Sequence, residues 1–250
     1  MGGRLRFPRR AGVATLVARR ALTPRMLRIT LRCEAFGRDW PIEQPGEIIT
    51  LLFAPPGEEI VLPLEGWLFP PGVDQPWRNY TVRRHDAAAG ELDVDVVLHE
   101  PRGPACTWAA RAPIGARVGY AGPRVDFAPR QDAEWLLLCG DETALPAIAA
   151  ILETRPASAI IEVADAAEQH DLPGKVRWVH RNGSALGAGL RAALREVALP
   201  EGAGQVWGAA ESRVARDVRD ILRGERALPR KHVKATGYWL RSGDWILDDL

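Results

Sequence analysis

The sequence has few cysteines, no long apolar run and almost no net charge, and each absence excludes a class of protein. Its 250 residues include three cysteines, Cys33, Cys106 and Cys139, which are far apart and lack the spacing of a metal site. This usage fits a reducing cytoplasm. No apolar run reaches the ~20 residues that a membrane helix needs. The formal net charge of +1 gives no general attraction to nucleic acid or membranes, so any anion site must be local.

Three sequence signatures are also missing. The basic start, MGGRLRFPRRAG, is not followed by an uninterrupted apolar segment, so it is not a signal peptide. The Gly-x-Gly-x-x-Gly fingerprint is absent, which argues against a standard Rossmann dinucleotide domain. Coiled-coil heptads are absent as well, so we expect a monomer.

What is present divides into two patterns, and the first predicts an all-β domain over residues 11–128. Short segments rich in branched residues alternate with Pro- and Gly-rich connectors such as PIEQPG and APPGEE. Such a series is typical of a barrel or a sandwich. One short helix is expected, over residues 106–111. The strand segments are GVATLVARRAL, MLRITLRCE, EIITLLFAP, WRNYTVRRH, ELDVDVVLHE and ARVGYAGPRVDF.

The second pattern begins after a short polar stretch at residues 128–132. A nearly continuous apolar run over residues 134–140 suits a strand buried on both faces of a parallel sheet. Strand-like and helix-like segments then alternate, which predicts an α/β domain over residues 132–241 with a mainly parallel sheet. Residues 242–250 form an acidic C-terminal tail.

The stretch Arg78-Asn79-Tyr80-Thr81 combines groups that suit a flavin nucleotide. On a strand, Arg78 and Tyr80 share one face and Thr81 points to the other. Arginine offers a charged donor fork for phosphate, tyrosine a ring for stacking, and threonine a short hydroxyl. From these four residues alone, an ordinary exposed strand with a surface arginine is the better interpretation.

The segment Gly103–Trp108 is a second candidate anion site. Small residues let a ligand approach the backbone, and the amides at the start of a helix attract phosphate. The alternative is a plain turn before a helix. Trp108 covers either a cofactor or the core, and His99, which ends the preceding strand, taken alone fits a structural or surface role.

The third candidate is the turn Cys139–Pro146, because ligands of open α/β sheets bind beyond the carboxyl ends of the strands. Its alternative is a generic turn between a strand and a helix. Later strands end in further candidates: Glu162, Arg181, Trp207 and Glu211. By analogy with dinucleotide domains, Glu162 favours the unphosphorylated ribose of NADH. Arg181 favours NADPH if it lies nearby, so the choice stays open.

Taken together, these motifs resemble those of the siderophore-interacting protein family, which comprises flavin-dependent ferric-siderophore reductases of the ferredoxin-reductase superfamily. They occur in the family's order over about residues 13–241. The motifs that carry the resemblance are RNYTVR (78–83), VLH (97–99) with GPA (103–105) and Trp108, AGPR (121–124), LCGDETALPAI (138–148), Trp207 with AE (210–211), and GYW (237–239).

The resemblance implies an antiparallel β-barrel that binds FAD. Arg78 would hold the pyrophosphate, Tyr80 would pack at the isoalloxazine and ribityl groups, and Thr81 would hydrogen-bond near the reactive flavin nitrogen. Val97 and His99 would lie beside the cofactor. Backbone groups that would take phosphate oxygens follow in the chain, with a tryptophan close by: Gly103, Ala105, Cys106, Thr107 and Trp108.

The resemblance also implies a ferredoxin-reductase-like α/β domain for NADPH or NADH. Electrons would pass through FAD to iron(III) in a siderophore, with no catalytic side chain and no metal ligand. Arg124 and Arg241 would attract the anionic ferric siderophore. The residues that would line the nucleotide site are Gly140, Asp141, Glu142, Thr143, Ala144 and Glu211.

Three positions depart from the family pattern. Thr50 stands where a lysine is common, which weakens the case for a highly anionic siderophore. Ala210 replaces a glycine and would narrow the approach of the nucleotide. The acidic tail, if it folded over the site, would oppose an anionic ligand. The alternatives are therefore a flavin reductase with another acceptor, such as a quinone or an iron–sulfur protein, and a siderophore-binding module without turnover.

Overall fold

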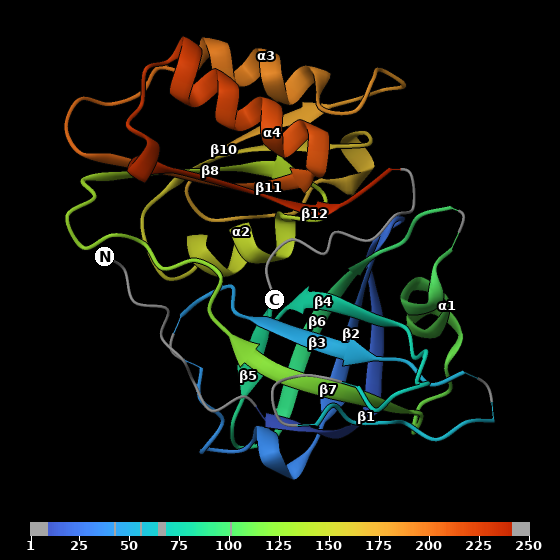
Figure 1. The fold of residues 1–250 in the computed structure, drawn as a ribbon. Helices are drawn as coiled ribbons and strands as arrows, with labels where there is room; N and C mark the ends of the chain where they lie inside the picture. Colours follow the sequence, from blue (N-terminus) through green and yellow to red (C-terminus); the bar gives the residue numbers. More distant parts are fainter. Residues whose placement is uncertain (1–9, 43, 56, 65–68, 101, 242–250) are drawn as a thin grey trace. The chain divides into compact units, whose positions relative to one another are not determined.

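The computed structural model describes residues 10–42, 44–55, 57–64, 69–100 and 102–241, so the acidic tail lies outside the described residues. The chain divides into two compact units between Ala128 and Pro129 (Figure 1). Within the ranges described, no helix has both the length and the hydropathy to cross a membrane.

Among its described residues, the first unit has an antiparallel sheet of seven strands, the α-helix α1 (Pro104–Arg111) and the 3₁₀ turn η1 (Glu34–Phe36). The strand order is β4-β3-β7-β1-β2-β6-β5. The strands are β1 (Arg10–Thr23), β2 (Met26–Arg32), β3 (Ile48–Leu52), β4 (Trp77–Thr81), β5 (Arg84–Asp86), β6 (Glu91–Val97) and β7 (Arg117–Arg124).

This sheet curls into a barrel. Strands β4 and β5 lie at opposite ends of the strand order, yet only residues 82–83 separate them in the chain. The amide of Arg83, between them, donates to the carbonyl oxygen of Asp93 on β6 at 2.9 Å. The first and last strands of the order must therefore meet, which confirms the predicted antiparallel β-barrel.

Apolar side chains at every second position of the strands fill the interior of the barrel. Leu27, Ile29 and Leu31 of β2 are buried, while the two residues between them are only partly buried. At one end, the rings of Phe36, Trp40 and Tyr120 pack with centroids 4.7–5.6 Å apart. These contacts fix the η1 turn against the barrel.

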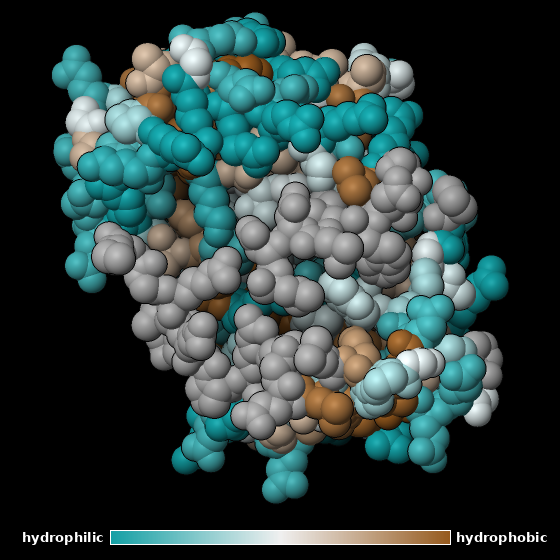
Figure 2. Space-filling model, in the orientation of Figure 1, coloured by the Kyte–Doolittle hydropathy of each residue, from teal (hydrophilic) through white to brown (hydrophobic). Residues whose placement is uncertain are grey.

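The second unit contains a fully parallel sheet of five strands, in the order β10-β9-β8-β11-β12. Helices α3 (Ala188–Glu196) and α4 (Ser212–Asp220) lie on one face and α2 (Leu145–Leu152) on the other (Figure 1). The surface over α3 and α4 is mostly hydrophilic (Figure 2). The strands are β8 (Trp135–Asp141), β9 (Ser158–Val163), β10 (Lys175–His180), β11 (Gly204–Glu211) and β12 (Val233–Trp239).

Short helical turns complete this unit: η3 (Ala166–Glu168), the π-helical η4 (Ile221–Glu225) that extends α4, and η5 (Arg230–His232). The predicted α/β class with a mainly parallel sheet is confirmed. Strand β12 was not predicted, because it lies at the edge of the sheet and most of its residues are only partly buried, so its sequence lacks an apolar run.

Candidate functional site

The candidate flavin site starts at β4, an edge strand of the barrel sheet. Its pairing with β3 sets Thr50 opposite Asn79, so Arg78 and Tyr80 share the other face, as predicted. Tyr80 packs against the barrel core, and this burial raises the pKa of its hydroxyl above the ordinary value. Thr81 is buried on the opposite face. The strand therefore presents a rigid aromatic ring beside a guanidinium.

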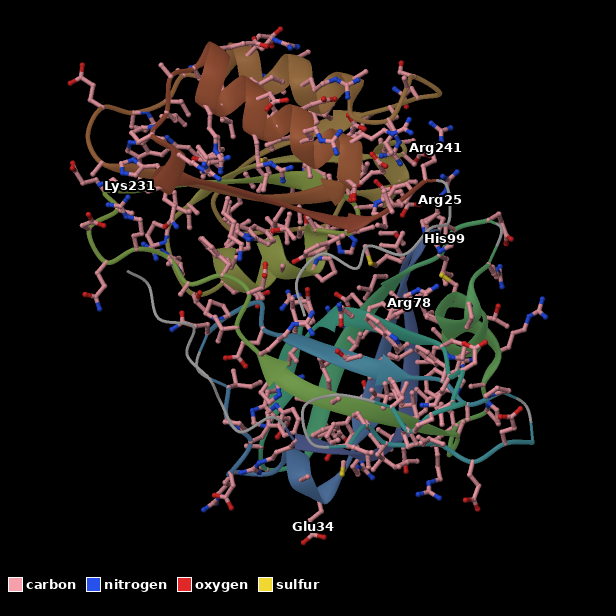
Figure 3. All side chains as sticks on the ribbon, viewed as in Figure 1. Arg25, Glu34, Arg78, His99, Lys231 and Arg241 are labelled. Carbon is pink, nitrogen blue, oxygen red and sulfur yellow. The ribbon has the colours of Figure 1, made fainter. Side chains whose placement is uncertain are left out.

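Arg78 lies next to the start of α1, and Figure 3 labels its position. A Cβ atom placed on Gly103 would stand 4.0 Å from the Arg78 Nη2 atom, and among the described residues that are not adjacent to Gly103 in the chain no atom would be closer. Gly103 is the N-cap residue of α1 and makes no side-chain capping bond. The amides of Ala105 and Cys106 come before the first intrahelical bond, so they need acceptors from outside the helix. A guanidinium, an open glycine and helix amides form a phosphate-binding set.

One predicted phosphate ligand is wrong. The amide of Thr107 donates to the carbonyl oxygen of Gly103 at 2.9 Å, because α1 begins at Pro104, two residues earlier than predicted. That amide belongs to the helix ladder. The other phosphate-binding residues assigned from the family motifs stay predictions, and the geometry of Arg78 and Gly103 fits the pyrophosphate of FAD.

Helix α1 is held at both ends by groups outside it. At its start, the Cys106 thiol donates to the carbonyl oxygen of Val97 at 3.2 Å. At its end, the guanidinium of Arg19 donates to the carbonyl oxygens of Ala110, at 3.0 Å, and Ala112. These bonds fix the helix whose first amides are predicted to bind phosphate. Sequence reasoning missed Arg19, since nothing in the sequence of β1 marks one arginine as the partner of a helix.

Two other predicted flavin contacts have defined places. The Trp108 ring packs on Phe53, with centroids 5.8 Å apart, so it ties α1 to the barrel core. His99 is exposed two residues beyond β6, near Arg25 in Figure 3. The amide of Leu98 donates to the carbonyl oxygen of Arg25 at 2.8 Å, which holds this segment beside the end of β2. A direct role of either residue at FAD stays a prediction.

The candidate acceptor residue Arg124 lies beside Thr50. Its Nη1 atom donates to the Thr50 hydroxyl at 3.5 Å, and that hydroxyl donates to the Asn79 side-chain oxygen at 2.7 Å. The neutral Thr50 therefore lies next to Arg124, at the position where the family resemblance led us to expect a lysine. Arg241 is exposed just after β12, in the second unit. Its predicted role in acceptor binding stays a prediction.

In the second unit, Asp141 is a buried structural hub. It is 1 % exposed, and its carboxylate accepts from the Thr143 amide (2.9 Å) and hydroxyl (2.5 Å), the Glu211 amide (2.9 Å) and the Trp239 indole (3.0 Å). It thus ties together the carboxyl ends of β8, β11 and β12. Burial raises the pKa of Asp141 to about 6, and the hydrogen bonds from Thr143 and Trp239 oppose this rise.

Other predicted nucleotide residues also serve the packing of the sheet. Glu211 caps α4 by accepting from the amides of Arg213 (2.8 Å) and Val214 (3.2 Å). A Cβ atom on Gly140 would stand 2.1 Å from the carbonyl oxygen of Ala209, so a glycine is needed there for close strand packing. Ala144 is fully buried. These roles explain the residues without a nucleotide, and their contact with one stays a prediction.

Two expectations for β11 are corrected. Trp207 lies in the middle of the strand and is buried, with its ring in a T-shaped contact with Tyr238 at 6.4 Å. Ala210 belongs to the buried core cluster, where its methyl group packs with apolar side chains. It therefore does not lie on the approach path of a ligand.

The carboxyl ends of β8, β9 and β10 bring together Glu142, Glu162 and Arg181. The Arg181 guanidinium donates both Nη atoms to the Glu142 carboxylate at 2.7 and 2.5 Å, and Nη1 lies 3.5 Å from the Glu162 carboxylate. Glu162 is fully buried and accepts from the amides of Gly187 (2.7 Å) and Leu190 (2.8 Å). The idea that Glu162 meets a ribose hydroxyl is thus wrong, because its carboxylate anchors α3.

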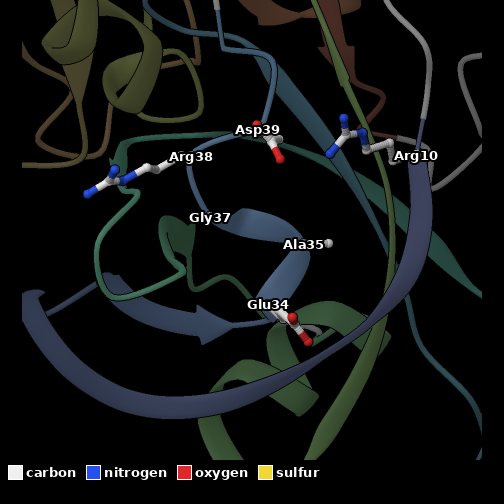
Figure 4. A pocket seen from close by; sticks show the side chains of 6 residues that line it. All are labelled: Arg10, Glu34, Ala35, Gly37, Arg38 and Asp39. Carbon is white, nitrogen blue, oxygen red and sulfur yellow. The ribbon is translucent and has the colours of Figure 1, made fainter.

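A hollow of about 400 Å³ lies elsewhere, where β1 meets η1 (Figure 4). None of the predicted site residues lines it. Over the described ranges, no cluster of three or more His, Cys, Asp and Glu side chains could hold a metal ion. The residues that line the hollow, of mixed charge, are Arg10, Glu34, Ala35, Gly37, Arg38 and Asp39.

Comparison with known proteins shows the family of this chain. Residues 15–127 match the family model of the siderophore-interacting FAD-binding domain, and residues 133–242 match that of the siderophore-interacting protein. The ferric vibriobactin reductase ViuB of Vibrio cholerae is 33% identical over 241 residues, covering 90% of this chain and 88% of the relative.

Solved structures give the same result. A siderophore utilization protein from T. fusca is 36% identical, covers 97% of both chains and superposes with a TM-score of 0.83. A ferredoxin NADP+ reductase from Neisseria gonorrhoeae shares the fold alone, with a TM-score of 0.66 at 14% identity over 92% of this chain and 99% of the other. The chain belongs to the siderophore-interacting protein family.

Proposed function

We propose that this protein is an NAD(P)H-dependent reductase that passes electrons through FAD to iron(III) in a ferric siderophore. The observation that carries the proposal is the meeting of Arg78 with the open N-terminus of α1, inside the region that matches an FAD-binding family model. The ViuB relative, named a ferric vibriobactin reductase, supports the reaction class.

In this proposal, the barrel residues bind and orient. Arg78 and the α1 amides neutralise the pyrophosphate, and the partly buried Tyr80 ring, packed against the barrel core, fixes the plane on which an aromatic ring system stacks. When bound, FAD supplies the chemistry that accepts a hydride from NAD(P)H and returns single electrons. Two ferric ions are reduced for each nucleotide oxidised. The free cysteines of the chain fit a reducing cytoplasm.

The acceptor side has a cationic guanidinium, Arg124, beside a neutral hydroxyl, Thr50. This arrangement favours a ferric chelate of modest negative charge, because one positive group attracts an anion less than two. It also supports a second candidate, a flavin reductase whose acceptor is a quinone or an iron–sulfur protein.

Three measurements test the proposal in order. The purified protein, reconstituted with FAD, is expected to show flavin absorbance bands. Mixing with NADH or NADPH in a stopped-flow instrument is expected to bleach them, and a ferric chelate is expected to restore them. Bleaching without reoxidation by several ferric chelates would support the second candidate. A flavoprotein that is not bleached would be a binding module, and failure to retain FAD would refute both reductase proposals.

A further inference from the structure

The feature that carries a further inference is the ion pair between Arg181 and Glu142. Arg181 is the cation that, if it lay near the nucleotide, was expected to favour NADPH over NADH. In the structure both of its Nη atoms bond to Glu142, and its side chain is 13 % exposed. A second carboxylate, Glu162, lies 3.5 Å away. The guanidinium is therefore already neutralised by two carboxylates.

The topology sets this ion pair where a nucleotide is expected to lie. From β8 the chain goes to β9 and β10 on one side, then crosses to β11 and β12 on the other side of β8. Ligands of such sheets bind outside the carboxyl ends of the strands, at this switch point. Glu142 directly follows β8 and Arg181 directly follows β10. A ligand extending along this edge meets the pair.

The local charge opposes a further anion. Three carboxylates, those of Asp141, Glu142 and Glu162, act electrostatically on the single guanidinium of Arg181. NADPH differs from NADH by one phosphate group, which carries nearly two negative charges at neutral pH. To bind Arg181, that phosphate would have to displace a carboxylate. NADH requires no such exchange.

The side chains of Glu142 and Glu162 differ in how freely they can move. Glu162 is fully buried and both of its oxygens bond to amides of the α3 N-terminus, so it cannot swing away. Glu142 has a side chain that is 21 % exposed, and among the described residues its carboxylate hydrogen-bonds to Arg181. Any choice between the two nucleotides therefore falls to Glu142.

We infer that Glu142 is a specificity-determining residue that keeps Arg181 from a 2′-phosphate, so the protein uses NADH in preference to NADPH. This inference rests on the proposed function, because it assumes that the carboxyl edge of the parallel sheet binds the nucleotide. Arg181 is held as a partner of two carboxylates and serves to position them.

A binding experiment tests this without flavin turnover. The probes are 5′-AMP and adenosine 2′,5′-bisphosphate, which differ by the 2′-phosphate alone, titrated by calorimetry into the full chain. The wild type is expected to bind 5′-AMP about tenfold more tightly than the bisphosphate, a difference of about 1.4 kcal/mol. Glu142→Gln, which keeps an oxygen for Arg181 but removes the charge, is expected to remove or reverse this preference.

Two controls separate charge from packing. Glu196→Gln neutralises an exposed carboxylate that pairs with Arg177 at 2.8 Å. Arg177 lies on β10, the strand that ends directly before Arg181. This variant is expected to leave the nucleotide preference unchanged. Glu142→Asp keeps the charge with a shorter reach and is expected to retain the preference. Circular dichroism melting confirms that each variant folds.

The kinetic version compares flavin bleaching by NADH and NADPH. A wild type that favours NADPH, or a Glu142→Gln variant with an unchanged ratio, overturns the inference while the reductase proposal stands. If neither nucleotide bleaches the flavin and neither adenosine probe binds, the proposed function itself is refuted, and the inference with it.

Discussion

The polar groups of the barrel site and those at the carboxyl edge of the parallel sheet differ in what they bond to. In the barrel, Gly103 leaves space beside Arg78, and the first amides of α1 have no acceptor within their helix. At the sheet edge, Asp141, Glu162 and Glu211 all bond to backbone amides of the unit itself. In the barrel, Arg78 donates one bond to the Trp77 carbonyl oxygen at 2.7 Å and lies beside helix amides that can take an outside acceptor, whereas the carboxylates at the sheet edge bond to the protein itself.

This difference teaches that a polar residue at a strand end is not by itself a ligand contact. A buried polar group must have a partner, and the partner is either a ligand or the protein. Variants that remove a polar group from each region should therefore give opposite results. The barrel variant loses cofactor with little loss of stability, and the sheet-edge variant loses stability first.

The largest effect is expected for Asp141→Ala. The change leaves four donors, from Thr143, Glu211 and Trp239, without their acceptor in a buried site. We expect a loss of about 3–5 kcal/mol in the free energy of unfolding, measured by urea denaturation. The outcome that would break the comparison is a normally stable variant that has lost only nucleotide binding.

The matching barrel variant, Arg78→Ala, is expected to weaken FAD binding by about 10–100-fold, because a charge-assisted contact to phosphate is worth about 1.5–3 kcal/mol. The measurement is fluorescence titration of the apoprotein with FAD. Arg84→Ala is the control, since that arginine is on β5 with an exposed side chain. Equal FAD affinity in both variants would show that Arg78 does not contact FAD.

The pH dependence of stability sharpens the comparison further. Burial raises the pKa of Asp141 to about 6, above its ordinary value of 3.8. The folded state then holds a proton more tightly than the unfolded state, so this group's contribution to stability falls as pH rises from 4 to 6 and is constant above. The change is on the order of 2 kcal/mol.

The measurement compares the free energies of unfolding of the wild type and Asp141→Asn between pH 4 and pH 7.5. The difference between the two proteins is expected to move against the wild type as pH rises through this window. A difference that is independent of pH would mean that the four donors keep Asp141 ionised throughout.

The smallest effect is expected for Arg124→Ala. Loss of one positive charge at the acceptor side is expected to slow reoxidation of reduced flavin by an anionic ferric chelate about two- to tenfold, and less at high salt. FAD content is expected to stay at the wild-type level. Arg117→Ala, at the exposed start of the same strand, is the control. A rate that is unchanged in Arg124→Ala would move the acceptor site away from the end of β7.

The sequence predicts the structure correctly where a repeating pattern of side chains, or a single turn, determines it. Alternation on β4 correctly puts Arg78 and Tyr80 on one face, and the apolar run before Gly140 correctly predicts a buried parallel strand. The start of α1 was predicted two residues too late. The sequence did carry a signal for the true start, Pro104, because proline is favoured in the first turn of a helix. That signal assigns the Thr107 amide to the helix.

Contacts between distant segments could not be predicted. The bond from Glu162 to α3 spans 25 to 28 residues, and that from Arg19 to the end of α1 spans more than 90. No local pattern distinguishes these side chains from surface charges. Whether a carboxylate caps a helix or meets a ligand depends on which element folds next to it.

The clamp of Arg19 on α1 has a consequence for how the cofactor arrives. Because a barrel strand holds the helix by its final carbonyl groups, the protein itself orients the amides that we propose bind phosphate. Association of FAD is then a docking onto an ordered surface and needs no coupled folding of the helix. Such an encounter is expected to follow a single exponential whose rate constant rises linearly with FAD concentration, and loosening the clamp would convert it into a two-step process with a plateau.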